Sequence, residues 1–167
     1  IKEYVRRVKE LGMDSAAITD HGVMYGVIDF YKACRAEGIR PILGCEVYVA
    51  PNSRFDKELT GGDDRYYHLV LLAENNTGYN NLTRIVSRGF TEGYYYKPRV
   101  DMELLQEFHE GIIALSACLA GEVQRYITKG LYDEAKKTAL KYQACFGKGN
   151  YFLELQDHGL PEQKMVN

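Results

Sequence analysis

The chain has 167 residues, with 21 Lys and Arg against 23 Asp and Glu, and a formal net charge of −2 at pH 7. Apolar residues make up 46% of the chain and charged residues 26%, an ordinary globular composition that excludes a disordered or low-complexity protein. The balanced charge excludes a protein that coats nucleic acid by bulk electrostatics, so any contact with DNA must be local. No window approaches the roughly 20 apolar residues of a membrane span, and we expect no membrane contact.

The first half of the chain shows helix and strand patterns in alternation. Apolar spacing predicts a helix over residues 1–11, and a short β-type run follows over residues 15–19. A second helix is expected over residues 25–37, and Gly38 follows it as a stop signal. The next strand covers residues 39–49. A turn-rich stretch then covers residues 51–65 and contains the run Gly61-Gly62-Asp63-Asp64.

The second half continues the same alternation. Its predicted elements, in chain order, are a buried strand over 68–73, a helix over 78–88, a tyrosine-rich loop over 92–99, a buried strand over 112–116, helices over 122–129 and 132–146, a strand over 151–156 and a helix from Pro161. The resulting order, α-β-α-β-β-α-β-α-α-β-α, predicts an α/β fold with a mostly parallel sheet or a barrel.

Cysteine is sparse and widely spaced, with no Cys-x-x-Cys pair. The four thiols are Cys34, Cys45, Cys118 and Cys145. In a chain of this length the spacing indicates reduced thiols in a cytoplasmic protein. Cys34 and Cys145 fall on apolar helical faces and are expected in the core, and Cys118 taken alone also fits a small core residue better than a ligand.

Side chains that bind metal ions gather at the ends of the predicted strands. Asp20 and His21 follow the first strand, Glu46 lies within the second, His68 opens the third, and Cys118 follows the next one. In a parallel α/β sheet, groups at the carboxyl ends of strands meet at one edge. Imidazole, carboxylate and thiol groups bind zinc, iron and manganese, so this set predicts a metal site.

Each of these residues also has a structural interpretation. A single histidine beside a strand is more often a hydrogen-bonded structural residue than a ligand. Glu46 is harder to explain in that way, because a buried carboxylate requires a cation or an arginine partner. Asp157 and His158 follow the last strand, but together with Gly159 they fit a strand-ending turn.

A second signal is the run from Tyr94 to Arg99. Lys97 and Arg99 beside three tyrosines are candidate contacts to phosphate or nucleic acid. The alternative, which we favour, is that the tyrosines pack this loop against the sheet with their hydroxyl groups toward water. In the preceding turn-rich stretch charges of both signs are balanced, which predicts a solvated surface; these residues are Arg54, Asp56, Lys57, Glu58, Asp63, Asp64 and Arg65.

Six segments together resemble one known family in order and spacing. They are residues 19–26 (Thr-Asp-His-Gly-Val-Met-Tyr-Gly), 41–48 (Pro-Ile-Leu-Gly-Cys-Glu-Val-Tyr), 64–73 (Asp-Arg-Tyr-Tyr-His-Leu-Val-Leu-Leu-Ala), 93–99 (Gly-Tyr-Tyr-Tyr-Lys-Pro-Arg), 114–121 (Ala-Leu-Ser-Ala-Cys-Leu-Ala-Gly) and 155–159 (Leu-Gln-Asp-His-Gly). The sequence resembles the PHP (polymerase and histidinol phosphatase) domain of bacterial DNA polymerase III alpha subunits.

The resemblance implies a distorted (β/α)7 PHP-type barrel that is incomplete at both ends. It implies that His21, Glu46, His68 and Cys118 bind divalent metal ions (Zn, Mn or Fe), with Asp20 orienting the adjacent imidazole or a metal-bound water. The first family motif, His-x-His-Thr, is expected before residue 1 and the last, Asp-x-His, after residue 167. Residues 1–167 are therefore expected to form a partial PHP domain without the polymerase domains.

The function that the resemblance implies is that of a replicative DNA polymerase fragment. The parent would extend primer-template DNA from deoxynucleoside triphosphates with Mg²⁺, alongside the sliding clamp and other polymerase III holoenzyme subunits, in the bacterial cytoplasm. No catalytic residue is assigned, because the polymerase carboxylates lie outside this sequence. The PHP region itself would hydrolyse phosphoesters, for instance as a 3′→5′ exonuclease. The alternatives are a free-standing PHP phosphoesterase acting on a small monoester such as histidinol phosphate, and a non-catalytic scaffold that docks a proofreading subunit.

Overall fold

A computed structural model describes residues 1–58 and 65–167 of the chain. The predicted turn residues Gly61, Gly62, Asp63 and Asp64 lie outside the described residues. The helices are α1 (Lys2–Glu10), α2 (Val27–Glu37), α3 (Asn76–Thr91), α4 (Met102–Glu107), α5 (Glu122–Thr128), α6 (Tyr132–Phe146) and α7 (Pro161–Val166). The strands are β1 (Ser15–His21), β2 (Arg40–Val49), β3 (Tyr67–Ala73), β4 (Tyr94–Tyr95), β5 (Lys97–Val100), β6 (Ile112–Leu115) and β7 (Tyr151–Phe152). Within the described ranges, no helix is both long and apolar enough to cross a membrane.

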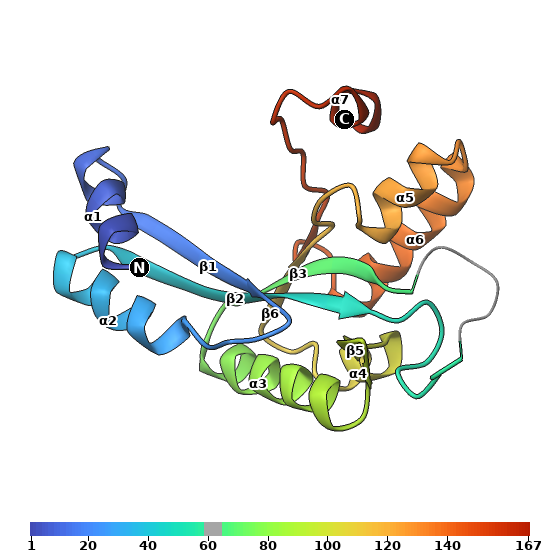
Figure 1. Cartoon of the computed structure of the whole chain (residues 1–167), viewed down its shortest axis with the longest axis horizontal. Helices are drawn as coiled ribbons and strands as arrows, with labels where there is room; N and C mark the ends of the chain where they lie inside the picture. The colour runs from blue at the N-terminus through green and yellow to red at the C-terminus, as the bar shows by residue number, and fades with distance from the viewer. Residues whose placement is uncertain (59–64) are drawn as a thin grey trace.

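The sheet is built around β2, the longest strand (Figure 1). β1 runs parallel to the first part of β2, and β5 runs parallel to its end on the same side. On the other side β3 pairs antiparallel with β2, followed by β6 antiparallel to β3 and β7 parallel to β6. The strand path β4-β5-β2-β3-β6-β7 has two separate ends, so the described strands form an open mixed sheet.

The prediction of an α/β fold is confirmed, whereas the prediction of a mostly parallel sheet is wrong. Parallel neighbours need a crossover, usually a helix, and no helix lies in the described part of the connection between β2 and β3. The chain therefore returns antiparallel along β2. The predicted order already placed two strands, 39–49 and 68–73, in succession without a helix between them, and such a pair favours an antiparallel arrangement.

The main core lies on one face of β2 and β3. Val47 and Leu69 point toward α3, where Leu82 and Ile85 are fully buried. A smaller core joins α1 and α2 to β1, with Phe30 at its centre. Figure 1 shows α3 along this face of the sheet, and α1 and α2 beside the first part of β1 and β2. Because side chains alternate along a strand, the opposite face of β2 is left for Glu46 and Tyr48.

Three elements differ from the predictions. β7 ends at Phe152, and the following residues, predicted as strand to Gln156, have no regular structure. The tyrosine-rich loop contains the short β4–β5 hairpin, whose turn residue Tyr96 has a positive φ of 61°. Helix α4 was not predicted; it begins at Asp101, whose carboxylate accepts a hydrogen bond from Leu104 N.

The prediction that the segment after β2 forms a solvated surface is wrong at Arg54, because the exposed fraction of this residue is only 6%. The Arg54 guanidinium donates to the carboxylates of Asp101 at 2.8 Å and Glu92 at 2.6 Å. The α4 N-cap thus supplies a buried counter-charge that sequence alone does not reveal. Lys57, from the same segment, donates to the backbone carbonyls of Glu92 and Tyr94.

Candidate metal centre

Strand register brings three of the predicted ligands onto one face of the sheet. His21 is the last residue of β1 and lies beside Glu46 in the parallel β1–β2 pair. His68 lies opposite Tyr48 in the antiparallel β2–β3 pair, and Tyr48 is on the same face of β2 as Glu46. His68 is therefore a diagonal neighbour of Glu46, within reach across the two strands.

Cys118 approaches from the turn after β6. The backbone N–H of His68 donates to Ala120 O at 3.0 Å, which fixes this turn beside the start of β3. Ala117 adopts a positive φ of 63°, a conformation that non-glycine residues rarely hold. The bend directs the Cys118 thiol toward His68, and the distance from Sγ to Nδ1 is 3.5 Å.

The four predicted ligands meet around the Glu46 carboxylate. Glu46 Oε1 lies 2.6 Å from His68 Nδ1 and 3.4 Å from His21 Nδ1. Ligand atoms of Glu46, His68 and Cys118 all lie within 4.8 Å of one another. The Glu46 and His68 side chains are 14% and 20% exposed, whereas His21 is 69% exposed at the rim.

The electrostatics of this group favour a positive charge at its centre. Hydrogen bonds to Cys118 and Glu46 raise the pKa of His68 to about 9, against the opposing effect of burial. Burial alone would raise the pKa of Glu46, but the hydrogen bond and charge of His68 outweigh it and lower that pKa. The His68 hydrogen bond also lowers the pKa of the Cys118 thiol. The Glu46 carboxylate and the Cys118 sulfur thus flank one position that a cation can occupy.

The donor set fits a divalent transition metal. One carboxylate oxygen, one imidazole nitrogen and one thiolate sulfur form a combination that zinc accepts readily, and iron and manganese also bind carboxylate and imidazole ligands. Three protein ligands leave further coordination positions open, as in catalytic zinc sites. His21 lies outside this triad, with its Nδ1 3.4 Å from Glu46 Oε1.

The sequence did not predict the hydrogen-bond network that holds the turn at residues 116–118, which leads into Cys118. Gln124 is 5% exposed, and its Nε2 donates to Ser116 Oγ at 2.7 Å and to Ala117 O at 3.3 Å. Ser116 Oγ also accepts from Glu154 N at 2.8 Å. This network ties the turn before Cys118 to α5 and to the segment after β7. Only the buried polar character of Ser116 inside an apolar run could have indicated it.

Asp20 has one described side-chain hydrogen bond: its carboxylate accepts from Gly26 N at 3.0 Å and so orders the loop that follows His21. That Asp20 orients the adjacent imidazole or a metal-bound water stays a prediction.

Asp157 and His158 lie in a turn outside the cluster. Asp157 Oδ1 accepts from Gly159 N at 3.1 Å, the short-range bond of a turn, and His158 is bonded to Gln163 of α7. The interpretation of this pair as a turn is therefore confirmed, but the turn does not end a strand, because β7 already ends at Phe152. The expected core positions of Cys34 and Cys145 are confirmed as well, and all four cysteines are free thiols.

The two candidate phosphate contacts occupy different environments. Arg99 is 4% exposed and donates to the backbone carbonyls of Gly93, Arg54 and Asp56. Its guanidinium therefore fixes the segment after β2 through hydrogen bonds to the carbonyls of Arg54 and Asp56. Lys97 is exposed, and its Nζ lies 5.4 Å from the centroid of the Tyr48 ring. Only Lys97 of this pair remains accessible to a ligand.

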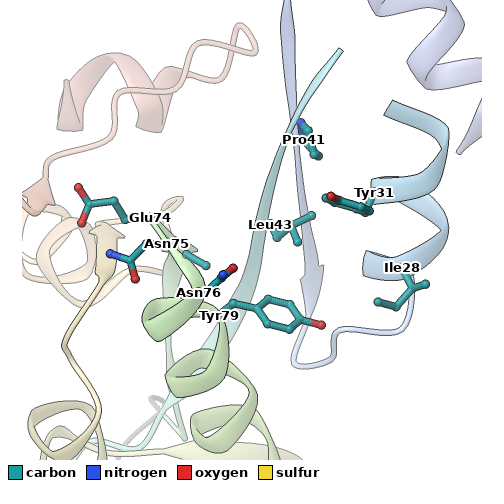
Figure 2. Close-up of a pocket in the computed structure, with 9 residues that line it drawn as sticks. Ile28, Tyr31, Pro41, Leu43, Glu74, Asn75, Asn76 and Tyr79 are labelled. Atoms are coloured by element: carbon teal, nitrogen blue, oxygen red, sulfur yellow. The ribbon is translucent and has the colours of Figure 1, made fainter. Parts of the chain in front are cut away.

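A separate cavity of about 360 Å³ lies between α2, the start of β2 and the start of α3 (Figure 2). Tyr31 of α2 and Tyr79 of α3 line it from opposite sides, and Pro41 and Leu43 of β2 also line it. None of the four candidate metal ligands lines this cavity, so it is distinct from the cluster.

The sequence model of the PHP domain matches residues 1–158 of the chain. The chain therefore belongs to the PHP domain family, as the six segments indicated. Among curated proteins it is similar to DNA polymerase III subunit alpha of Treponema pallidum, with 52% identity over 166 residues. It is also similar to the subunits of the same name from Deinococcus radiodurans (47% identity over 174 residues) and Thermus aquaticus (45% over 170 residues).

These matches cover 99–100% of this chain but only 13–14% of each relative. The chain thus spans about one seventh of the length of the curated relatives that it matches. Among solved structures, a protein of Bifidobacterium adolescentis described as a metal-dependent phosphoesterase superposes with a TM-score of 0.51. That match covers 98% of this chain and 74% of the other at 12% identity, so it supports the fold alone.

Proposed function

We propose that this chain is the metal-binding PHP region of a bacterial DNA polymerase III alpha subunit. Its metal centre would be formed by Glu46, His68 and Cys118, with His21 as a fourth ligand. The observation that carries the proposal is the convergence of three ligand types within 4.8 Å at positions of a PHP-family sequence. Identity of 45–52% to three alpha subunits over nearly the whole chain favours this parent over a free-standing phosphoesterase.

The activity proposed for this site is hydrolysis of a phosphoester, including the 3′→5′ exonuclease reaction on DNA. A divalent ion at the cluster would supply Lewis-acid activation of water and of the phosphate group. Glu46 would bind the ion, and its Oε1 also orients the imidazoles of His21 and His68. Cys118 would supply a thiolate that balances part of the charge of the ion. Zn, Mn and Fe are the proposed ions.

The wider assignments follow from the proposed parent. The full-length subunit would synthesise DNA on primer-template with deoxynucleoside triphosphates and Mg²⁺, in the cytoplasm, with the sliding clamp and other holoenzyme subunits as partners. We also propose that the open sheet is part of a (β/α)7 barrel completed by segments beyond the described strands. This is consistent with the two free ends of the strand path. The scaffold alternative, in which the region only docks a proofreading subunit, predicts no bound metal.

Metal analysis of the full-length subunit tests the proposal. Elemental analysis after purification should give bound Zn, Mn or Fe, and Glu46→Gln and His68→Ala should each reduce metal affinity at least tenfold, as expected for loss of a ligand or its partner. The matched control is His109→Ala, since His109 is an exposed histidine bonded to Gln106 O. Equal metal content in wild type, both variants and the control would contradict the ligand assignment. If the subunit binds metal but hydrolyses neither DNA ends nor bis(4-nitrophenyl) phosphate, the proposed phosphoesterase activity is wrong. The metal centre would then be structural.

A further inference from the structure

The candidate metal centre would carry no net charge with one divalent ion bound, and so would attract an anionic substrate only weakly. Glu46 and Cys118 bind a metal as carboxylate and thiolate, and their two negative charges cancel those of one divalent ion. The histidines add no charge as neutral ligands. A phosphate group is anionic, so a neutral centre gains little long-range attraction for it. A cation beside the cluster would supply that attraction.

Lys97 lies on the wall of this centre. It is the first residue of β5, which pairs in parallel with the end of β2 through Tyr48 and Arg99. Lys97 Nζ lies 5.4 Å from the Tyr48 ring centroid, and the Tyr48 ring in turn lies 5.4 Å from the His68 ring. The Tyr48 ring thus contacts both the Lys97 ammonium and the ligand His68.

A second set of contacts connects the same regions. Gly22, directly after His21, has no side chain, and a Cβ there would lie 2.8 Å from Tyr48 Cε2 and 3.0 Å from Pro98 Cγ. The end of β1 therefore contacts the start of β5. His21 and Lys97 are the immediate sequence neighbours of these two residues, so the backbone that carries the ligand His21 lies close to the backbone that carries Lys97.

The ammonium of Lys97 is available. Within residues 1–58 and 65–167, no carboxylate lies within ion-pair distance of it, and its described interaction is with the ring of Tyr48. Arg65 is also exposed, and its guanidinium lies 5.0 Å from the ring of Tyr96, which precedes Lys97. Lys97 thus lies against a tyrosine ring that contacts the ligand His68, whereas Arg54 and Arg99 are buried inside the protein.

The hairpin geometry supports a positioned side chain. Tyr96, which precedes Lys97, holds a positive φ of 61°, and its ring packs edge-on against Tyr95 at 4.7 Å. Non-glycine residues hold such a conformation only where the surrounding structure enforces it, and such positions concentrate at functional sites. The Tyr48 ring then restricts the path of the Lys97 side chain, which lowers the entropy lost on ligand binding.

We propose that Lys97 binds the phosphate group of the substrate at the metal centre, with Tyr48 holding the lysine side chain toward the cluster. The inference rests on the proposed metal-dependent phosphoesterase and names the group that holds its anionic substrate. Lys97 contributes mainly to binding, because its charge attracts the phosphate before and during the reaction alike.

Cobalt substitution of the full-length subunit gives a readout specific to this site. A Co²⁺ ion bound by the Cys118 thiolate has a charge-transfer absorption band that a site with only oxygen ligands lacks. Titration with inorganic phosphate, followed by this band, should give saturable binding in the wild type. Lys97→Met should weaken phosphate binding about tenfold, the loss expected for one charge-assisted contact, while the band before phosphate addition is unchanged. Lys97→Arg should restore most of the affinity.

The matched control is Lys136→Met, since Lys136 is exposed on α6 and belongs to none of the contacts above. Phosphate binding in this control should equal that of the wild type. A normal cobalt band with equal phosphate affinity in wild type and Lys97→Met would overturn the role of Lys97 and leave the metal centre standing. Absence of the thiolate band from the wild type would overturn the metal centre, and with it this inference.

Discussion

Tyr48 and His68 face each other across the antiparallel β2–β3 pair, with ring centroids 5.4 Å apart and ring planes at 75°. Tyr66 adds a third ring, which lies 6.0 Å from His68 and nearly parallel to it. The imidazole is therefore in contact with two aromatic rings as well as with Glu46 and Cys118. Such packing limits the rotamers of His68 and holds its Nδ1 toward the carboxylate before any ion arrives.

The two histidines should contribute unequally to metal binding. His68→Ala removes a partly buried ligand from the compact triad, whereas His21→Ala removes an exposed ring 3.4 Å from Glu46. We expect His68→Ala to weaken Zn²⁺ affinity about 100-fold and His21→Ala about tenfold or less. Competition titration with a chromophoric chelator measures both. An equal loss in the two variants would contradict the geometry.

Gly22 should not tolerate a side chain. Its φ is +70°, and a Cβ would meet Tyr48 and Pro98 at 3.0 Å or less. Gly22→Ala should destabilise the fold by about 2–4 kcal/mol, the sum of backbone strain and overpacking. Gly12 is the matched control, since its φ is +74° but nothing lies within 4 Å of its Cβ position. Gly12→Ala should cost only about 1 kcal/mol, so equal losses on chemical denaturation would exclude steric conflict at Gly22.

The buried Arg54 should be among the most sensitive positions of the chain. Arg54→Met leaves the Asp101 carboxylate buried without its cation, and removal of one partner of a buried pair costs about 3–5 kcal/mol. Arg88→Met is the comparison, because Arg88 pairs with Glu107 near the surface and such pairs are worth about 0–1 kcal/mol. Urea denaturation monitored by circular dichroism separates the two. A loss at Arg54 as small as that at Arg88 would contradict the buried network.

Glu122 should make stability depend on pH. Burial raises its pKa above the ordinary value, although the Tyr142 hydroxyl donates to it at 2.8 Å. A carboxyl group whose pKa is raised on folding contributes stability that is complete below about pH 4 and is lost as the pH rises through its folded-state pKa. Glu122→Gln keeps an acceptor for Tyr142 and removes this titration. The stability of Glu122→Gln relative to wild type should therefore increase between pH 4 and pH 7.

Thermal denaturation of both proteins across this pH range measures that difference. Glu3→Gln is the comparison, because Glu3 is an exposed glutamate on α1 and its replacement removes no buried carboxyl group. A relative stability of Glu122→Gln that falls as the pH rises would contradict the burial effect.

The candidate ligands could be proposed from sequence because metal-binding side chains occur at the ends of apolar strands or, in one case, inside such a strand, where a carboxylate needs a partner. Glu46 between Cys45 and Val47 is such a case, and helix periodicity likewise located α2 and α6 closely. Strand direction was not predictable from the same patterns, since an apolar strand has the same composition whether its neighbour is parallel or antiparallel. The burial of Arg54 and the contact of Asp20 with Gly26 depend on residues distant in sequence or on loop shape, which composition does not encode.

Three of the four candidate ligands stand on strands whose relative positions are fixed by backbone hydrogen bonds. A slip of one residue between β1 and β2 would turn His21 to the opposite face of the sheet. The site therefore depends on strand register more than on any single side-chain contact, and a single-residue deletion within β2 would dismantle the centre.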